Sequence, residues 1–494
     1  MRRVVLPPFG LSLLLTGCGL LSGPSGDDGS RDTAQESDSG DPTDTGDDTD
    51  TGDDTGGGDD TGDPTETCDA GDLYTRCDGD DVILCDNGTE ARIDCPDTCG
   101  SDPDVDSWCQ GEMPSTSLSA GYYGDANLSR FYTWIAQGDL EFDRLELDAG
   151  TTLLVKPLST LTVNDALLAP GTKSRPVHIA SSKSSPGAGD WERLILGLNH
   201  QSRLDHTTIE HFRGIDSAGD LDLFDCTIQE VEVDGALGGA VHQENTTESS
   251  YSVLRVVRSE VNRVSGGDGI HVSEWVDLEL QDCLIQDIDG AGVYIDAMDA
   301  TVSDTEIQSA QIGLSAVYTN LSVAGLSVSD TSDYGLVTER SWGSVVDAEV
   351  TGSPDFCFGV LEWETSLSTA MDFDHVSCSG ASTAAFRVNL VATRPGDGLG
   401  SVDLSAYDVR DTPAFMKLYG HAELSADGGN AVTSKVFTSD SDSDWSGIRF
   451  QSDGAYWNGK SAGQVEAAFE ALVPSASASV TNVAGSELSG VGAR

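Results

Sequence analysis

The fold is decided between Leu254 and Arg340, where one tripeptide pattern recurs as Ser259-Glu260-Val261, Cys283-Leu284-Ile285, Thr305-Glu306-Ile307 and Leu326-Ser327-Val328. After each copy comes a small residue followed by an apolar one, as in Gly269-Ile270, Gly292-Val293, Gly313-Leu314 and Gly335-Leu336. Counting along the last residue of the pattern gives steps of 22, 21 and 22 residues from Ile285 to Val350. A fixed period of this length is typical of a solenoid, in which each repeat contacts only its neighbours.

Apolar and polar residues alternate within each repeat, which is the pattern of short β-strands with one buried face. Gly and Asp mark the corners, where tight turns need a positive φ or local side-chain bonding. Coils stacked about 4.8 Å apart would pair each strand with its equivalents above and below, and form one continuous core. The sequence therefore predicts an all-β fold, a right-handed parallel β-helix over residues 118–455, with a C-terminal cap helix and tail over 456–494.

Residues 1–17 have the features of an export signal, with Arg2 and Arg3 before an apolar stretch from Val4 to Leu15. The following Leu15-Thr16-Gly17-Cys18 resembles the lipobox of bacterial lipoproteins. That resemblance implies cleavage before Cys18, diacylglycerol on its sulfur and an acyl chain such as palmitate on its amine, a firm multi-chain anchor. Gly19 rather than Asp after the cysteine implies transport onward, so the expected location is the outer membrane, lipid-anchored and exposed at the cell surface.

Residues 18–67 follow the lipidated cysteine as an Asp-, Thr- and Gly-rich segment without aromatic or large aliphatic residues after Leu21. Such a composition cannot offset the entropy of ordering, so we expect a disordered tether extended by its own negative charge. Asp-rich runs also suggest Ca²⁺ loops, but the spaced oxygen ligands of an EF-hand are absent.

Residues 68–112 form a small polar module with six cysteines: Cys68, Cys77, Cys85, Cys95, Cys99 and Cys109. An even number in so short an exported module predicts three disulfides, although the sequence does not choose among fifteen pairings. A zinc site is the alternative, and the absence of Cys-x-x-Cys pairs and of histidine makes it the weaker one.

The opening coils repeat the same cadence of strand and turn, as in Thr152-Leu153-Leu154-Val155, Leu161-Thr162-Val163, Val177-His178-Ile179 and Leu194-Ile195-Leu196. From about residue 140 to 430 the chain resembles right-handed β-helix proteins of the pectin-lyase-like superfamily. The resemblance implies the fold but not an activity, because that superfamily includes lyases, hydrolases, tailspikes and adhesins.

Polygalacturonase-like members of the superfamily carry Asn-Thr-Asp-Gly, Asp-Asp and Gly-His-Gly on successive coils. Gly267-Asp268-Gly269 resembles the first motif, but the next coils carry Asp289-Gly290-Ala291 and Gln311-Ile312-Gly313 instead. A glycosidase needs two carboxylates on either side of the bond it cleaves. Only Asp268 is in place, and a corner residue is its simpler interpretation.

Lyase-type β-helices use Ca²⁺ bound by carboxylates, with Arg or Lys as the base. The densest group of candidate residues here lies on adjacent coils and comprises His242, Glu244, Asp268, His271 and Asp296. Isolated histidines on outward strand positions are more often simply solvated. We therefore predict no required cofactor, with Ca²⁺ as a compatible ion, and lean toward a protein that is not an enzyme.

Two further cysteine pairs lie in the solenoid. Cys226 and Cys283 each precede an inward Ile by two residues and are two coils apart, about 9–10 Å, so we predict buried free thiols. Cys357 and Cys378 occupy different coil positions, and their pairing is left open.

Residues Leu128 to Ile135 have helical spacing and suggest an N-terminal cap, or a strand, while Val465 to Leu472 after Ser461 predict a C-terminal helix.

The net charge of −58, from 26 basic and 84 acidic residues, opposes nucleic acid and other polyanions as partners. The membrane, through Cys18, and a glycan or surface protein remain as partners. The leading hypothesis is a non-catalytic β-helix presented for adhesion or glycan binding. A Ca²⁺-dependent polysaccharide lyase or epimerase and a structural envelope protein are the alternatives.

Overall fold

The structure of this chain, a computed structural model, describes strands within residues 73–110 and most of residues 113–493. The description has gaps at 79–80, 87–88, 95–97, 103–104, 199–200, 234, 236–237, 246–250, 353–354, 363–368, 391–399, 421, 440–447 and 473–476. The predictions for the signal peptide, Cys18 and the tether lie outside these described residues.

The predicted six-cysteine module consists of short antiparallel strands where the structure describes it. One sheet contains β1 (Leu73–Asp78), β2 (Asp81–Asp86) and β3 (Thr89–Asp94), and another contains β4 (Thr98–Asp102) and β5 (Val105–Gln110). Cys77 is disulfide-bonded. The other five cysteine side chains of the predicted disulfide framework lie outside the described part of the module.

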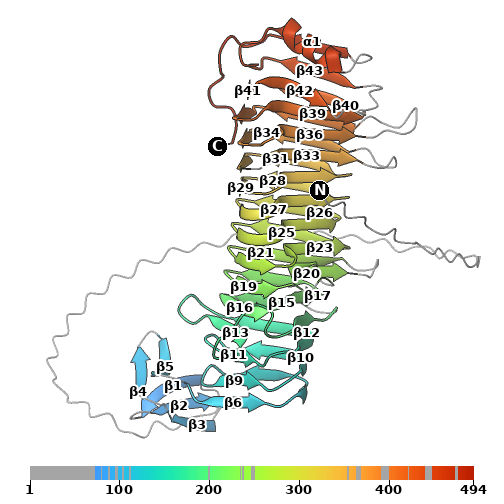
Figure 1. Ribbon diagram of the computed structural model, residues 1–494. Coiled ribbons are helices and arrows are strands. Elements are labelled where there is room, and N and C mark those ends of the chain that lie inside the picture. Colours follow the sequence, from blue (N-terminus) through green and yellow to red (C-terminus); the bar gives the residue numbers. More distant parts are fainter. Residues whose placement is uncertain are drawn as a thin grey trace, which may run out of the picture. The chain divides into compact units, whose positions relative to one another are not determined.

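The long domain is a right-handed parallel β-helix whose coils stack from β6 to β44 (Figure 1). Each coil contributes strands to three sets, which we name A, B and C in chain order. Set A comprises β7 (Gly121–Tyr122), β10 (Leu140–Leu147), β12 (Leu161–Pro170), β14 (Leu194–Leu196), β17 (Ile215–Ser217), β20 (Gly239–Asn245), β23 (Asp268–Glu274), β25 (Leu284–Ala297), β27 (Glu306–Val317), β30 (Tyr334–Glu339), β33 (Phe356–Glu362), β36 (Ala384–Leu390), β39 (Ala414–Gly420) and β42 (Lys435–Ser439).

Set B comprises the later parts of β10 and β12 together with β8 (Ala126–Leu128), β15 (Ser202–Asp205), β18 (Leu221–Phe224), β21 (Ser252–Val257), β24 (Val276–Gln281), β26 (Asp299–Ser303), β28 (Asn320–Ala324), β31 (Trp342–Val346), β34 (Ala370–Asp374), β37 (Gly400–Ser405), β40 (Ala422–Asp427), β43 (Arg449–Asp453) and β44 (Ser477–Thr481). Set C comprises the first parts of β25 and β27 together with β6 (Ser115–Leu118), β9 (Thr133–Ala136), β11 (Thr152–Val155), β13 (Val177–Ser181), β16 (Thr207–Phe212), β19 (Thr227–Glu232), β22 (Glu260–Ser265), β29 (Ser327–Ser329), β32 (Glu349–Thr351), β35 (Ser377–Ser379), β38 (Asp408–Arg410) and β41 (Asn430–Val432).

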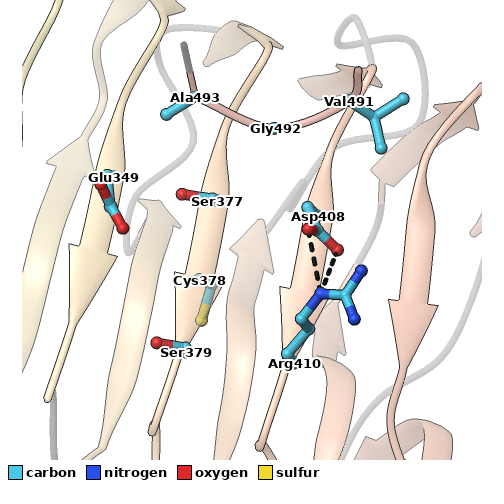
Figure 2. Close-up of a pocket in the computed structure, with 9 residues that line it drawn as sticks. All are labelled: Glu349, Ser377, Cys378, Ser379, Asp408, Arg410, Val491, Gly492 and Ala493. Atoms are coloured by element: carbon cyan, nitrogen blue, oxygen red, sulfur yellow. Dashed lines mark hydrogen bonds and ion pairs between the residues drawn. The ribbon is translucent and has the colours of Figure 1, made fainter. Parts of the chain in front are cut away.

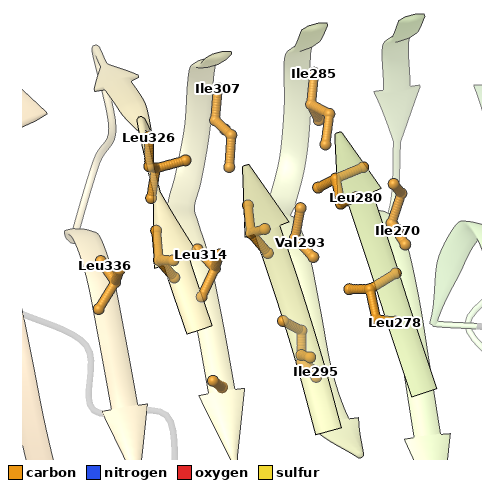
Figure 3. Close-up of a cluster of buried hydrophobic side chains, with 14 of the residues drawn as sticks. Ile270, Leu278, Leu280, Ile285, Val293, Ile295, Ile307, Leu314, Leu326 and Leu336 are labelled. Carbon is orange, nitrogen blue, oxygen red and sulfur yellow. The ribbon is translucent and has the colours of Figure 1, made fainter. Parts of the chain in front are cut away.

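The strand register confirms the predicted repeat. Ile285 pairs with Ile307, Ile307 with Val328, and Val328 with Val350. All four side chains belong to the core. Figure 3 shows Ile285 and Ile307 pointing into the interior toward inward residues of sets A and B. Because the core runs unbroken through the coils, no single coil has to be stable by itself.

The predicted corner residues have the positive φ angles that the tight turns need. Asp282, Asp304 and Gly325, which each precede the tripeptide pattern by one position, have φ angles of 53°, 46° and 70°. Asp tolerates this left-handed conformation better than most residues, and Gly adopts it without steric cost. The turn from set B to set C therefore repeats from coil to coil.

Two cysteines of the solenoid are free and buried, as predicted. The Cys226 thiol donates to the Leu204 carbonyl at 3.3 Å, and the Cys283 thiol donates to the Gln281 carbonyl at 3.1 Å. Burial raises the pKa of Cys226 to about 12 and that of Cys283 to about 11. Both thiols therefore act as core residues with a hydrogen bond to a backbone carbonyl of set B, and Ser259 in the coil between them does the same with Val257.

The two ends of the solenoid differ from each other. The predicted C-terminal helix is α1 (Ala462–Leu472), where Gln464 Oε1 accepts from the Ser461 backbone N–H at 2.9 Å and Phe469 packs on Phe450. The helical interpretation of Leu128 to Ile135 is wrong, because these residues lie in and around β8 and β9. Their backbone groups pair in register with β10 and β11, and this ladder outweighs the local spacing.

In the part of the chain that the structure describes, no helix is both long and apolar enough to cross a membrane.

Candidate functional site

One column of outward side chains on set A contains most of the titratable candidates. Asp216 pairs with His242, His242 with His271, and His271 with Tyr294, one residue from each of four successive coils. In the neighbouring column, two residues further along the strands, Ser273 lies between Glu244 and Asp296, and pairs with both of them. Since outward residues alternate along a strand, the two columns lie side by side on the same face.

Each histidine of the column has a carboxylate partner. His271 Nδ1 lies 2.9 Å from Asp268 Oδ2, and His242 Nδ1 lies 3.2 Å from Asp216 Oδ1. Glu244 is a more distant neighbour of His242, at 3.9 Å from Nε2. A carboxylate at one ring nitrogen orients an imidazole and leaves the other nitrogen for a ligand.

The rings of this column also stack. The His242 and His271 centroids are 5.5 Å apart, and those of His271 and Tyr294 are 4.5 Å apart with nearly parallel planes at 18°. The stacking follows from the register, because successive coils place equivalent side chains about 4.8 Å apart. The three rings together form a short aromatic strip along the solenoid axis.

Glycines create the space that the strip occupies. A Cβ on Gly239 would lie 2.8 Å from the His271 Cβ, and one on Gly290 would lie 2.4 Å from Asp268 Oδ1. Asp268 Oδ1 accepts in turn from the Ala291 backbone N–H at 2.7 Å. Asp268 is therefore fixed by its own corner while it also contacts His271.

Electrostatics couple the second column to the first. Burial raises the pKa of Asp296, and His271 opposes that rise. Burial also raises the pKa of Tyr294, and the carboxylates of Asp296, Asp268 and Glu339 raise it further. The structure thus brings all five predicted site residues together on three adjacent coils.

Two members of this face were not among the predicted site residues. Asp216 precedes His242 by 26 residues, outside the regular part of the repeat, so no fixed period pointed to it. Alternation along the strand identifies Tyr294 only as an outward residue, and its stacking on His271 depends on the exact register. Among the described residues, no group of three or more His, Cys, Asp or Glu side chains is placed to hold a metal ion.

A separate cavity of about 270 Å³ lies on set C near the C-terminal end of the solenoid. Figure 2 shows its lining residues: Glu349, Ser377, Cys378, Ser379, Asp408, Arg410, Val491, Gly492 and Ala493. The Arg410 guanidinium is already paired with Asp408 at 3.0 Å and with Glu487 at 2.7 Å. This cavity is a gap beneath the final segment of the chain and shares no residue with the His271 face.

The fold and the face define a right-handed parallel β-helix protein with a histidine, carboxylate and tyrosine strip on set A. No protein-family model and no curated protein matches the sequence. Among solved structures, the chain is similar to the periplasmic alginate epimerase AlgG, with 10% identity, a TM-score of 0.34, and coverage of 61% of this chain and 85% of that one. It is also similar to the catalytic domain of a GH87 alpha-1,3-glucanase, with 11% identity, a TM-score of 0.28, and coverage of 67% and 72%. At this level of sequence identity and TM-score, neither structure bears on what this chain binds.

Proposed function

We propose that this protein is a lipid-anchored protein of the outer membrane that presents its β-helix, of the pectin-lyase-like superfamily, at the cell surface to bind a glycan. The observation that carries the glycan part is the strip of His242, His271 and Tyr294, in which stacked rings lie beside the carboxylates that contact the two histidines. Sugars are recognised by such a combination, because they have apolar faces and hydroxyl edges. Binding without turnover is the primary proposal, since no intact glycosidase or lyase motif occurs in the sequence.

The Ca²⁺-dependent lyase or epimerase remains the second candidate, and one observation favours it. Asp296, whose pKa is raised by burial, and the carboxylate-paired His271 place two groups of the kind used in acid–base catalysis on the same face. Such an activity would need these groups to reach the sugar carbon or ring oxygen that reacts.

A purely structural envelope protein is the third candidate, for which no glycan would be captured.

The glycan proposal is tested with a glycan array probed with and without Ca²⁺ and read for both capture and cleavage. We expect capture of at least one glycan class, and we expect His271→Ala to weaken it at least tenfold, or about 1.4 kcal/mol. Asp268→Asn should weaken it less, because the amide can still accept from the Ala291 N–H. Affinity of each variant is measured by calorimetry on the captured glycan.

The matched control is His178→Ala, because His178 makes an equivalent contact to Glu210, at 2.9 Å, but lies on set C. Its binding should equal that of the unmodified protein. Unchanged binding and turnover in His271→Ala and Asp268→Asn would show that this face carries no function. Cleaved products that require Ca²⁺ would support the lyase or epimerase instead.

The anchor is tested by Cys18→Ser in the producing bacterium. We expect this variant to incorporate no labelled palmitate and to leave the membrane fraction, because a Ser side chain cannot form the thioether. Gly19→Asp is the control, and it should keep the label while changing the membrane in which the protein is found. Label retained by Cys18→Ser would contradict the proposed anchor.

A further inference from the structure

A row of large apolar side chains follows the corner where set A turns into set B. Five successive coils each contribute one member near this corner, and we name these residues the corner row: Tyr251, Trp275, Met298, Tyr318 and Trp342. They are not all in register, since Trp342 pairs with Asn320, two residues beyond Tyr318. Four of them are exposed, with 59% of Tyr251, 42% of Met298, 38% of Tyr318 and 40% of Trp342 accessible. Large apolar groups that gather on a surface usually mark a place of interaction.

The contacts within the corner row show an ordered surface. The rings of Tyr251 and Trp275 meet edge to face with centroids 5.9 Å apart. The Arg340 guanidinium lies 5.0 Å from the centroid of the Tyr318 ring and supports it from one side. Four steps between coils of about 4.8 Å make the row about 19 Å long, which is the length of a chain molecule rather than of a small one.

The corner row is continuous with the His271 face. Tyr294 and Asp296 point outward from β25, and Met298 follows them by two residues at the corner. Val317, which pairs with both Asp296 and Glu339, directly precedes Tyr318. A ligand that lies along the strip of rings would therefore touch the corner row with its other edge.

The charge of this surface selects among ligands. No Lys or Arg occurs between Arg263 and Arg340, whereas Glu274 directly precedes Trp275 and Asp299 directly follows Met298. Burial raises the pKa of Asp277, and the neighbouring Asp299 carboxylate raises it further. Carboxylates repel polyanions, and both carboxylates and aromatic faces attract ammonium groups.

We propose that the corner row, with the adjoining His271 face, binds a polysaccharide that bears primary amines, of the glucosamine type. This inference rests on the proposed glycan binding and names its ligand class. Ammonium groups of such a chain would meet Glu274, Asp299 and Glu339, while the sugar faces would stack on the exposed rings. A lipid surface fits less well, because the arginines between Tyr251 and Trp342 are already paired with carboxylates: Arg255 with Glu279, Arg258 with Asp225, Arg263 with Glu230 and Arg340 with Glu339.

The test compares chitosan oligosaccharides with their fully N-acetylated counterparts and with oligogalacturonates, by calorimetry at low and at high salt. We expect the amine-bearing chains to bind at least tenfold more tightly than the acetylated ones at low salt. The difference should shrink at high salt, because ions screen the exposed carboxylates. Trp342→Ala should weaken chitosan binding about tenfold, Trp342→Phe should retain most of it, and Glu274→Gln should reduce the preference over the acetylated chains.

Tyr122→Ala is the control for the loss of an exposed ring, because Tyr122 is 61% exposed but lies at the N-terminal end of set A. It should bind like the unmodified protein. Equal or tighter binding of acetylated or acidic chains would overturn the amine inference and leave the glycan proposal standing. Capture of no glycan at all would overturn both, as would binding of vesicles or proteins through the corner row in place of glycans.

Discussion

Ile307→Ala is expected to lower the free energy of unfolding of the β-helix by about 2–5 kcal/mol. Ile307 is fully buried between Ile285 below and Val328 above, and its Cγ2 lies 2.5 Å from where a Cβ on Gly292 would be. A cavity at this point cannot collapse easily, because the backbone on both sides is fixed by ladder hydrogen bonds. Urea titration followed by far-ultraviolet circular dichroism measures the change.

Gln308→Ala is the matched control, because Gln308 is the next residue on the same strand and points outward. Its side chain bonds only to Glu306 among the described residues, so its loss should change the unfolding free energy by no more than about 0.5 kcal/mol. Equal losses in the two variants would mean that the assignment of inward and outward positions is wrong. In a β-strand such an error of one residue would reverse every side chain of the coil.

The regular coils were predictable from sequence because their length varies by only one residue. Ile285, Ile307, Val328 and Val350 each recur at the same point of the coil, so the pattern itself defines the register. Earlier coils vary far more, since Ile209 pairs with Ile228 and Ile228 pairs with Val261. Asp216 lies in that part, and its place beside His242 follows from strand pairing and not from spacing.

The corner row shows a second limit of sequence reasoning. Alternation along the strands makes Trp275, Tyr318 and Trp342 outward residues, but their positions shift between coils at the corner, and Trp342 pairs with Asn320, two residues beyond Tyr318. The step from Glu274 to its partner Ala297 is longer than the step from Asp296 to Val317. Side chains that look unrelated in a strict repeat therefore become neighbours only when the pairing of the strands is known.

The pairing of Cys357 with Cys378 depends on how sets C and A approach each other inside a coil. In the preceding coil, Gly335 lies so close to Val350 that a Cβ would be 2.2 Å from its Cγ1. The residues around Gly335 pair with those around Cys357, and Val350 pairs with Cys378. Cys357 on set A and Cys378 on set C occupy different positions along the coil, but they face each other across the interior. They form a disulfide with Cα atoms 5.9 Å apart.

Replacement of both Cys357 and Cys378 by Ala is expected to lower the unfolding free energy by about 3 kcal/mol. The bridge closes a loop with a sequence separation of 21, and its removal returns that conformational freedom to the unfolded chain. Cys283→Ser is the control, because the hydroxyl can replace the thiol as donor to the Gln281 carbonyl, as Ser259 does for Val257 one coil earlier. Its cost should stay below about 1.5 kcal/mol.

Because Cys378 belongs to set C strand β35, beside the last coils, the double variant should expose the C-terminal coils to hydrogen exchange before the central ones. Uniform exchange along the solenoid would contradict this local role and indicate that the bridge stabilises all coils equally.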